Sequence, residues 1–461
     1  MLGLILTALS AVQGPAELKS VLNSAAEKLN KEKDIEVGIR VESLGGEVVY
    51  DYQGEDPFVL ASNVKVLTTA AALLQLGPDF RWHTELWLDG TTLWVVGSGD
   101  PSLRRLPAGD ASEVFLDQVV ESLKENRISS LSSVVLDARC IASPPRNPLW
   151  PEDQWQETYC APVAALAVEG GCLEITASGG GVRVAPALDP PVAVDFRHTG
   201  KGKPVSAWWA SRGLVVRGDM YSGESIRLAV RDPVETFGRW FKAGLQSRGV
   251  LCERVAVAES EESVPGSRIL NYQSAWTLAD AVALANLESD NFTAELILLA
   301  LGNSPERSST TQIGARKVLE NLEPLGVNSA RIKQADGSGL ARSDIEQTNL
   351  AAPADLCAVL RGMAERVEGR GFFRSLPIGG VQGRLARRFQ GPIFQPQRVR
   401  AKTGWISGAS SLSGYLLTIQ DEVIVFSIVV NYVRDGTART HNKRFRDFQE
   451  SILGSVLALR G

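Results

Sequence analysis

The stretch from about residue 84 to residue 264 differs in pattern from the sequence on both sides of it, and this contrast constrains the fold most. Inside the stretch, short apolar runs such as 93–96 and 134–136 are separated by clusters of Gly, Pro and Ser, which is typical of β structure. Outside it, residues 62–76 are rich in helix formers, and apolar residues follow a helical period over 278–287 and again over 292–301, with a break expected at Ser289-Asp290. The pattern predicts one domain that is interrupted in sequence by an inserted, largely β segment.

The flanking parts predict strands as well as helices. Residues 35–43 alternate between apolar and polar side chains, and the strand pattern resumes after a turn at Gly45–Gly46, so a hairpin is expected. Two further strand-like runs, 411–419 and 423–432, precede a closing helix over 442–459. The fold class predicted for the interrupted domain is therefore α/β (α+β).

Composition narrows the classes of function. The net charge of the 461 residues is −5, from 48 basic and 53 acidic residues without a long run of either sign, so binding to nucleic acid has little support. The five cysteines lack C-x-x-C spacing, which argues against a zinc ribbon. A Ser-His-Asp mechanism is not expected, because none of the three histidines lies in a nucleophile-elbow motif. These are His83, His198 and His441.

The first residues resemble the core of a secretory signal. Residues 2–12 are apolar or small, a length too short to span a bilayer as a helix, and 1–14 is the predicted signal segment. The basic residues that usually precede such a core are missing, and a buried N-terminal helix is the alternative. The closing helix carries Arg444, Arg446 and Asp447 and lacks the profile of a strong membrane anchor.

Ser62 and Lys65 are candidates for an activated nucleophile and its base. They stand three residues apart at a predicted helix start, so the hydroxyl can reach the amine on one face of the helix. A lysine in a dry site near a second cation favours its neutral form and can accept the serine proton. The alternative explanation of S-x-x-K alone, without a catalytic role, is the start of a surface helix.

Two further motifs follow in the chain. In Ser289-Asp290-Asn291, the hydroxyl of Ser289 can relay a proton while the amide of Asn291 holds a peptide carbonyl, although S-D-N alone is more often a capping turn. In Lys402-Thr403-Gly404, the lysine offers a fixed cation, the threonine a donor for a carboxylate, and the glycine close approach to a strand. The three motifs together, in this order, are the specific signal.

The sequence resembles the low-molecular-weight class C penicillin-binding proteins of the penicillin-binding protein 4 type, peptidase family S13. The likeness covers nearly the whole chain after about residue 30 and includes passages outside the three motifs. These are 60–73, 97–103, 159–166, 336–340 and 376–385. Ser289 follows Ser62 by 227 residues, far more than in an ordinary class A β-lactamase, and the family fills this interval with two inserted domains.

The resemblance implies a β-lactamase/transpeptidase-like domain with a five-stranded antiparallel sheet and helices, split by two β-rich inserts. The implied boundaries are 15–84 and 265–461 for the catalytic domain, 85–108 and 167–264 for inserted domain II, and 109–166 for inserted domain III. It also implies a periplasmic or other extracytoplasmic serine D-Ala-D-Ala carboxypeptidase or endopeptidase that cleaves peptidoglycan stem peptides through an acyl-serine and is acylated by β-lactams. No cofactor and no metal are implied.

The resemblance assigns a role to each matching residue. Ser62 is acylated, Lys65 is its base, Ser289 is the relay and Asn291 the carbonyl ligand. Lys402 and Thr403 clamp the terminal carboxylate. The backbone N–H groups of Ser62 and Trp405 form the oxyanion hole, and Gly404 of the K-T-G motif directly precedes Trp405 on its strand.

The chain departs from its relatives at three places. Trp405 stands where the enzymes that the chain resembles commonly have a small hydroxyl residue, Leu60 where they often have Pro, and Gln382-Gly383-Arg384 where they commonly have D-G-T. These differences bear on specificity more than on catalysis. Asp153 and Tyr159, with Trp150, are candidates to contact the diamino acid of the substrate, and ordinary packing is their alternative explanation.

Two other functions remain open from the sequence. A β-lactamase needs a deacylating base, and the class A E-x-x-L-N pattern is absent, because the Leu-Asn pairs are preceded at that distance by Lys19, Ala26 and Ser267. A catalytically silent cell-wall binding protein would keep the inserts but not the six polar residues of the motifs.

Overall fold

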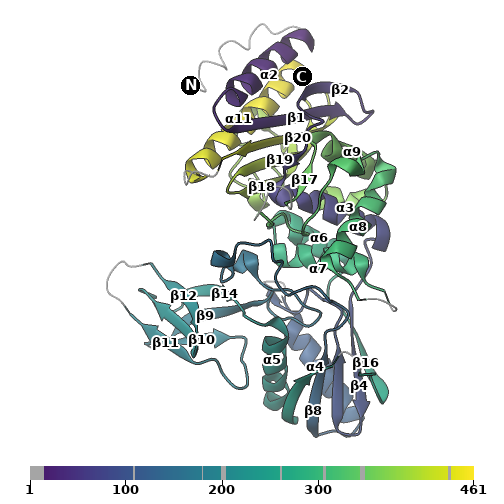
Figure 1. Ribbon diagram of the computed structural model, residues 1–461, viewed down its shortest axis with the longest axis vertical. Coiled ribbons are helices and arrows are strands. Elements are labelled where there is room, and N and C mark those ends of the chain that lie inside the picture. Colours follow the sequence, from purple (N-terminus) through teal and green to yellow (C-terminus); the bar gives the residue numbers. More distant parts are fainter. Residues whose placement is uncertain are drawn as a thin grey trace. The chain divides into compact units, whose positions relative to one another are not determined.

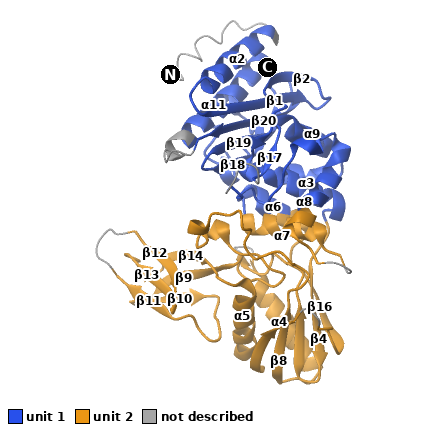
Figure 2. Cartoon of the chain, viewed as in Figure 1, with its two compact units in different colours: residues 1–78, 282–290, 315–461 blue, residues 79–281, 291–314 orange. Residues whose placement is uncertain are grey.

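The computed structural model describes residues 15–106, 109–178, 180–198, 204–259, 262–304, 308–342, 348–433 and 438–460. The predicted signal segment 1–14 lies outside them. The chain forms two compact units, of which unit 1 comprises residues 1–78, 282–290 and 315–461 and unit 2 comprises residues 79–281 and 291–314 (Figure 2). Within the described part of the chain, no helix has both the length and the apolar character needed to cross a membrane.

Unit 1 is built on a five-stranded sheet in the order β18-β19-β20-β1-β2, in which every pair of neighbours is antiparallel. The predicted five-stranded antiparallel sheet is therefore confirmed. Its strands are β1 (Ile35–Ser43), β2 (Val48–Tyr52), β18 (Val399–Ile406), β19 (Ala409–Leu417) and β20 (Val423–Tyr432).

Alternation along β1 decides which helices cover each face of this sheet. Ile35, Val37, Ile39 and Val41 are buried in one cluster with side chains from α2 (Pro15–Asn30) and α11 (Ala438–Arg460). The intervening residues of β1 face α9 (Pro353–Ala364), and Glu42 pairs there with Arg361. Figure 1 shows α2 and α11 on one side of the sheet and α9 on the other.

Helix α3 (Val64–Leu76) is buried over residues 64–73 and packs against α9. A short 3-10 turn, η2 (Ala61–Asn63), leads into α3. Strand β3 directly precedes this turn in the sequence and pairs with β17. The other elements are β3 (Phe58–Val59), β17 (Leu350–Ala351), α8 (Thr311–Leu322), which crosses the boundary between the units, and α10 (Gly369–Ser375).

Unit 2 contains a mixed five-stranded sheet in the order β15-β8-β5-β4-β16. The pairs β5–β8 and β8–β15 are parallel, while β4 pairs antiparallel with β5 and β16. Parallel neighbours need crossover connections, and two helices, α4 and α5, provide them. The elements are β4 (His83–Asp89), β5 (Thr92–Val96), α4 (Ala111–Glu125), β8 (Ser130–Asp137), α5 (Pro233–Ser247), β15 (Leu251–Val257) and β16 (Ser267–Gln273).

Two three-stranded sheets and two further helices complete unit 2. The sheets have the orders β10-β9-β14 and β11-β13-β12. Their strands are β9 (Cys172–Ser178), β10 (Gly181–Ala185), β11 (Val194–Arg197), β12 (Ser206–Ala210), β13 (Gly213–Arg217) and β14 (Ser225–Ala229). The short β6 (Arg105–Leu106) pairs with β7 (Gly109–Asp110), α7 is Asn291–Gly302, and α6 (Leu278–Leu287) crosses the unit boundary.

The interval predicted to be largely β also contains α4 and α5. Asp110 and Asp232 cap these helices, since their side chains accept from the backbone N–H groups of Glu113 and Glu235. Strand β8, from the range predicted for inserted domain III, pairs with β5 and β15 from the range predicted for domain II. The division of the interval into two inserted domains stays a prediction.

Candidate active site

Ser62 and Lys65 meet at the start of α3. Lys65 Nζ donates to Ser62 Oγ at 3.2 Å and to the backbone oxygen of Ser338 at 2.7 Å. The Lys65 side chain is fully buried, whereas Ser62 is partly exposed. The preceding residue, Ala61, has a left-handed φ of 49°, a conformation that costs a residue with a side chain free energy and so marks a constrained turn. The hydroxyl is thus presented to solvent with an amine beside it.

A second buried lysine, Lys402 of the third motif, contacts the serine of the second motif. Lys402 Nζ, on β18, donates to Ser289 Oγ at 2.9 Å and to the backbone oxygen of Thr403 at 2.9 Å. Its side chain is fully buried. Burial, and then the positive charges of Lys65 and Arg384, hold the pKa of Lys402 well below its usual value. The structure therefore brings Lys402 and Ser289 together, with Lys65 close enough to repel the Lys402 ammonium group.

Gly404 is required by the protein's own packing. A Cβ at this position would lie 2.7 Å from the backbone oxygen of Leu60 and would collide with the Ser411 hydroxyl. That hydroxyl donates to the Leu60 oxygen at 2.6 Å and so connects β19 to the turn before Ser62. The explanation predicted for Gly404, close approach of a substrate backbone, is not tested by the structure. Its packing against Leu60 and Ser411 explains the glycine within the protein itself.

The N–H groups of β18 point alternately toward β19 and toward the outer edge of the sheet. Ala401 N donates outward, to the backbone oxygen of Pro377 at 3.0 Å. Because N–H direction alternates along a strand, the N–H groups of Thr403 and Trp405 point to the same outer edge. The Trp405 side chain is 42% exposed.

The loop 336–341 contributes contacts to the site that the motifs did not reveal. The fully buried Asp336 carboxylate accepts from the backbone N–H groups of Gly339, Leu340 and Ala341 at 2.6, 3.0 and 2.6 Å. This folds the loop so that the Ser338 oxygen meets Lys65. A backbone acceptor has no side-chain signature, but the D-G-S-G pattern, with Gly339 at φ 84°, is a turn signal that could have indicated the loop.

Asn291, Tyr159 and Asp153 belong to unit 2, because the unit boundary falls after Asp290. Asn291 begins α7, and its Nδ2 donates to the backbone oxygen of Tyr159 at 2.9 Å. The Tyr159 side chain is 42% exposed, and its hydroxyl donates to Gln154 Oε1 at 3.0 Å. Asp153 is exposed on η3 (Glu152–Gln154). Trp150 is 2% exposed, so packing explains that side chain.

Comparison with known proteins identifies the family. A family model described as the D-Ala-D-Ala carboxypeptidase 3 (S13) family matches residues 18–451. The chain belongs to this S13 family. The predicted class, a serine-type D-Ala-D-Ala carboxypeptidase, is therefore confirmed.

Relatives of this S13 chain align over most of its length. It is 26% identical to the D-alanyl-D-alanine carboxypeptidase of Actinomadura sp. (strain R39), over 90% of this chain and 81% of the relative. It is 25% identical to D-alanyl-D-alanine carboxypeptidase DacB of Haemophilus influenzae, over 86% of this chain and 85% of the relative.

A solved structure shares the fold of this S13 chain. Penicillin-binding protein 4 of H. influenzae superposes with a TM-score of 0.78 at 22% identity, covering 95% of this chain and 99% of that one. The same protein has also been solved in complex with a β-lactam, with a TM-score of 0.73 and the same identity and coverage. The predicted fold class is thereby confirmed.

Proposed function

We propose that Ser62 is the acylated nucleophile of this S13 enzyme and that the enzyme cleaves D-alanyl-D-alanine bonds in peptidoglycan stem peptides, as a carboxypeptidase or an endopeptidase. The observation that carries the proposal is the pair of buried lysines, each donating to one serine hydroxyl: Lys65 to Ser62 and Lys402 to Ser289. Two ammonium charges buried close together repel, so the pair gives up a proton more readily than an isolated lysine.

In the acylation step, Ser62 Oγ attacks the carbonyl carbon of the D-alanyl residue before the scissile bond. The coupled lysine pair reacts in the form that carries one proton between its two amines: with that proton on Lys402, the amine of Lys65 takes the Ser62 proton, and the N–H groups of Ser62 and Trp405 stabilise the oxyanion. The C–N bond then breaks, and the leaving amine receives a proton through Ser289 and the Lys402 ammonium group. Water hydrolyses the resulting ester, which returns the Ser62 hydroxyl and releases the shortened peptide.

The remaining motif residues have positioning roles in this proposal. Thr403 donates to the terminal carboxylate with Lys402 as the nearby cation, and Asn291 holds a peptide carbonyl. Asp153 and Tyr159 stay candidates for contact with the substrate's diamino acid. We also propose β-lactams as inhibitors, supported by the β-lactam complex of the H. influenzae structure, and an extracytoplasmic location, supported by the cell-wall substrate.

The test is the mass of the intact protein after incubation with benzylpenicillin, compared among wild type, Ser62→Ala and Ser451→Ala. Ser451 is an exposed serine on α11 and serves as the matched control. One penicilloyl adduct on wild type and Ser451→Ala, and none on Ser62→Ala, is expected. An adduct retained by Ser62→Ala would overturn the assignment of the nucleophile.

The same samples separate the alternatives. A long-lived adduct, with release of D-alanine from a D-Ala-D-Ala peptide, is the expected result. Rapid turnover of benzylpenicillin without release of D-alanine would favour a β-lactamase. No adduct and no D-alanine from a folded protein would favour a wall-binding role.

A further inference from the structure

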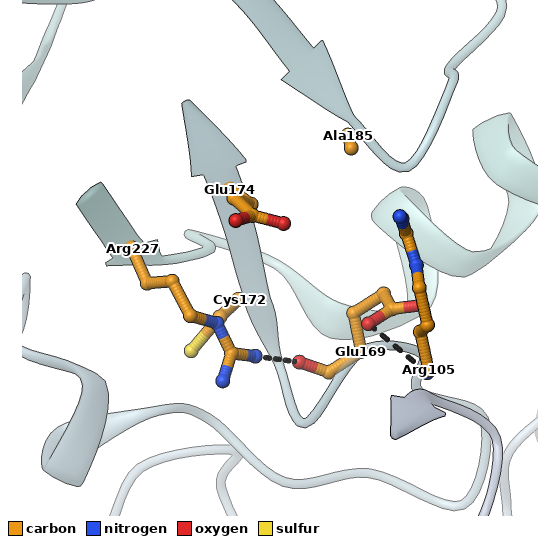
Figure 3. A pocket seen from close by; sticks show the side chains of 6 residues that line it. All are labelled: Arg105, Glu169, Cys172, Glu174, Ala185 and Arg227. Carbon is orange, nitrogen blue, oxygen red and sulfur yellow. Dashed lines mark hydrogen bonds between the residues drawn. The ribbon is translucent and has the colours of Figure 1, made fainter. Parts of the chain in front are cut away.

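A second site lies in unit 2, on one face of the β10-β9-β14 sheet. A cavity of about 210 Å³ is lined there by Arg105, Glu169, Cys172, Glu174, Ala185 and Arg227 (Figure 3). Glu174 on β9 pairs directly with both Ala185 on β10 and Arg227 on β14, so these side chains share one face of the sheet. Glu169 lies in the turn before β9, and Arg105 begins β6.

Within the part of the chain that the structure describes, the charged side chains that line the cavity form no ion pair with one another. Side chains directly opposite on paired strands lie close enough for opposite charges to join. Among the described residues, however, no ion pair links Glu174 to Arg227, whose guanidinium instead donates to the backbone oxygen of Glu169 at 2.7 Å. The Arg105 guanidinium lies 3.7 Å from Asp110, and the Glu169 carboxylate accepts from the backbone N–H of Arg105. Arg227 and Glu174 thus retain hydrogen-bonding capacity toward the cavity.

The equal numbers of basic and acidic side chains around the cavity favour a ligand that carries both charges. Two arginines and two glutamates give a formal charge near zero, so a simple anion would meet the glutamates and a metal cation would meet the arginines. A molecule with both a carboxylate and an ammonium group satisfies both signs. Burial also raises the pKa of Glu169, and a bound ammonium group would stabilise its carboxylate form. The volume is below the roughly 300–1,000 Å³ of pockets for drug-sized ligands, which points to a single amino acid.

We infer that this cavity binds a free amino-acid zwitterion, with Arg227 on its carboxylate and Glu174 on its ammonium group. The candidate ligand is D-alanine, which rests on the proposed function, because hydrolysis of a D-alanyl-D-alanine bond releases it. The cavity would then be a second binding site for the product, built from residues that take no part in the acylation chemistry.

The experiment is calorimetric titration of the full chain with D-alanine, N-acetyl-D-alanine and D-alanine methyl ester. Saturable binding of D-alanine is expected, with at least about tenfold weaker binding of each analogue, since each lacks one charge. The variants are Arg227→Met and Glu174→Gln, and the control is Arg183→Met. Arg183 is an exposed arginine on β10 whose side chain does not line the cavity.

Both cavity variants should weaken D-alanine binding at least about tenfold, while Arg183→Met should not change it. Glu174→Gln keeps the shape of the side chain and guards against a folding defect in Arg227→Met. No saturable binding, equal binding of N-acetyl-D-alanine, or unchanged binding in both cavity variants would each overturn the inference. Penicilloyl adduct formation, measured on the same proteins, reports separately on the proposed function.

Discussion

At the scale of single residues, Arg384 lies next to the second motif and acts on the buried Lys402. Its guanidinium donates twice to the backbone oxygen of Glu288, at 3.1 and 3.0 Å, next to Ser289. Its charge also helps to lower the pKa of Lys402. The sequence shows Arg384 only as a departure from D-G-T, whereas the structure gives the residue an electrostatic role.

Arg384→Gln should move the acid limb of benzylpenicillin acylation to higher pH, by about 0.5–1 unit. The acid limb moves to higher pH because removing a nearby cation raises the pKa of Lys402. The lysine pair then loses its proton only at a higher pH. The measurement is the second-order acylation rate between about pH 5 and 9. Arg384→Lys keeps the cation and should leave the limb in place, and a shift shared by both variants would point to altered packing instead.

The polar residues of the three motifs could be proposed as candidates from the sequence because the residue type identifies a side-chain donor or acceptor. The Ser62–Lys65 contact was expected from the S-x-x-K spacing, whereas the contact between Ser289 and Lys402 was not predicted. The Ser338 oxygen could not be found in this way, since any residue offers the same backbone acceptor. The packing reason for Gly404 was also hidden, because it depends on Leu60 and Ser411, which are distant in sequence.

At the scale of elements, the loop 336–341 is held by one carboxylate. Asp336→Ala would leave the N–H groups of Gly339, Leu340 and Ala341 buried without their acceptor. We expect a loss of roughly 3 kcal/mol or more in the free energy of unfolding, and slower acylation because Lys65 loses a fixed contact at Ser338. Urea unfolding and the acylation rate check this. The exposed Asp447→Ala should change the free energy of unfolding by less than about 0.5 kcal/mol. Equal stability of the two variants would contradict this role for Asp336.

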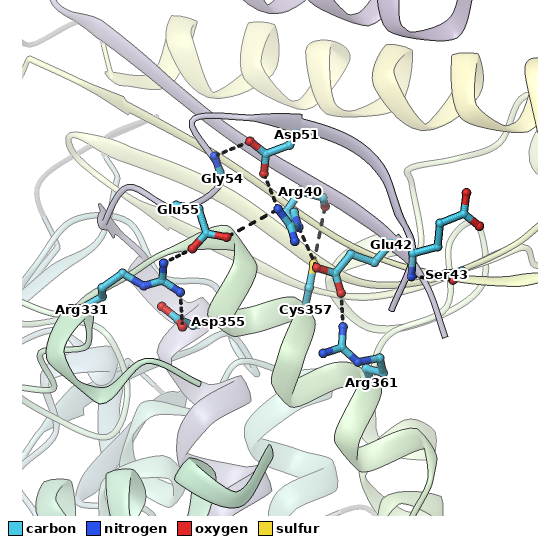
Figure 4. A network of polar contacts seen from close by, with 11 residues as sticks. Arg40, Glu42, Ser43, Asp51, Gly54, Glu55, Arg331, Asp355, Cys357 and Arg361 are labelled. Atoms are coloured by element: carbon cyan, nitrogen blue, oxygen red, sulfur yellow. Dashed lines mark hydrogen bonds and ion pairs between the residues drawn. The ribbon is translucent and has the colours of Figure 1, made fainter. Parts of the chain in front are cut away.

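A network of ion pairs joins β1 and β2 to α9 and the turn before it (Figure 4). Arg40 lies between Glu42 at 2.6 Å and Asp51 at 2.8 Å, and Arg361 also pairs with Glu42. Glu42 is only 3% exposed. Breaking a buried pair leaves a charge without its partner, which is costlier than replacing both partners by apolar groups.

Arg40→Met removes one of the two arginines around the buried Glu42 carboxylate and leaves Arg361 as the other, so it should lower the free energy of unfolding by about 1–3 kcal/mol. Arg40→Met with Glu42→Leu should lower it less, because the buried charge is then removed as well. Chemical unfolding of the two variants measures the difference. Lys31→Met removes an exposed ion pair with Glu27 and should cost less than about 1 kcal/mol. A double variant as unstable as the sum of its single changes would show that packing, and not the unpaired charge, dominates.

Local patterns predicted four strands and two helices of unit 1, but not α8, α9 or α10. The hairpin, the helix from 62, the strands 411–419 and 423–432 and the closing helix correspond to β1–β2, η2–α3, β19, β20 and α11. Helices α4 and α5 were missed, although Asp110 with Glu113 and Asp232 with Glu235 have the spacing of N-terminal capping signals. The parallel β5–β8–β15 order could not be predicted locally, because crossover pairing is decided by tertiary packing.

At the scale of the whole molecule, each unit has its own hydrophobic core. One cluster includes Leu116 of α4 and lies entirely in unit 2, and another includes Leu453 of α11 and lies entirely in unit 1. Chains with separate cores commonly depart from two-state unfolding. Calorimetric heating should therefore resolve two transitions.

The two transitions can be assigned with one core variant in each unit. Leu116 and Leu453 are 1% and 0% exposed, so replacing either with Ala should cost about 2–5 kcal/mol by leaving a cavity. Leu453→Ala should lower only the Tm of the transition that belongs to unit 1, and Leu116→Ala only that of the other. Acylation by benzylpenicillin should shift the unit 1 transition, because Ser62 lies in that unit. A single transition that both variants lower alike would mean that the two cores unfold as one cooperative structure.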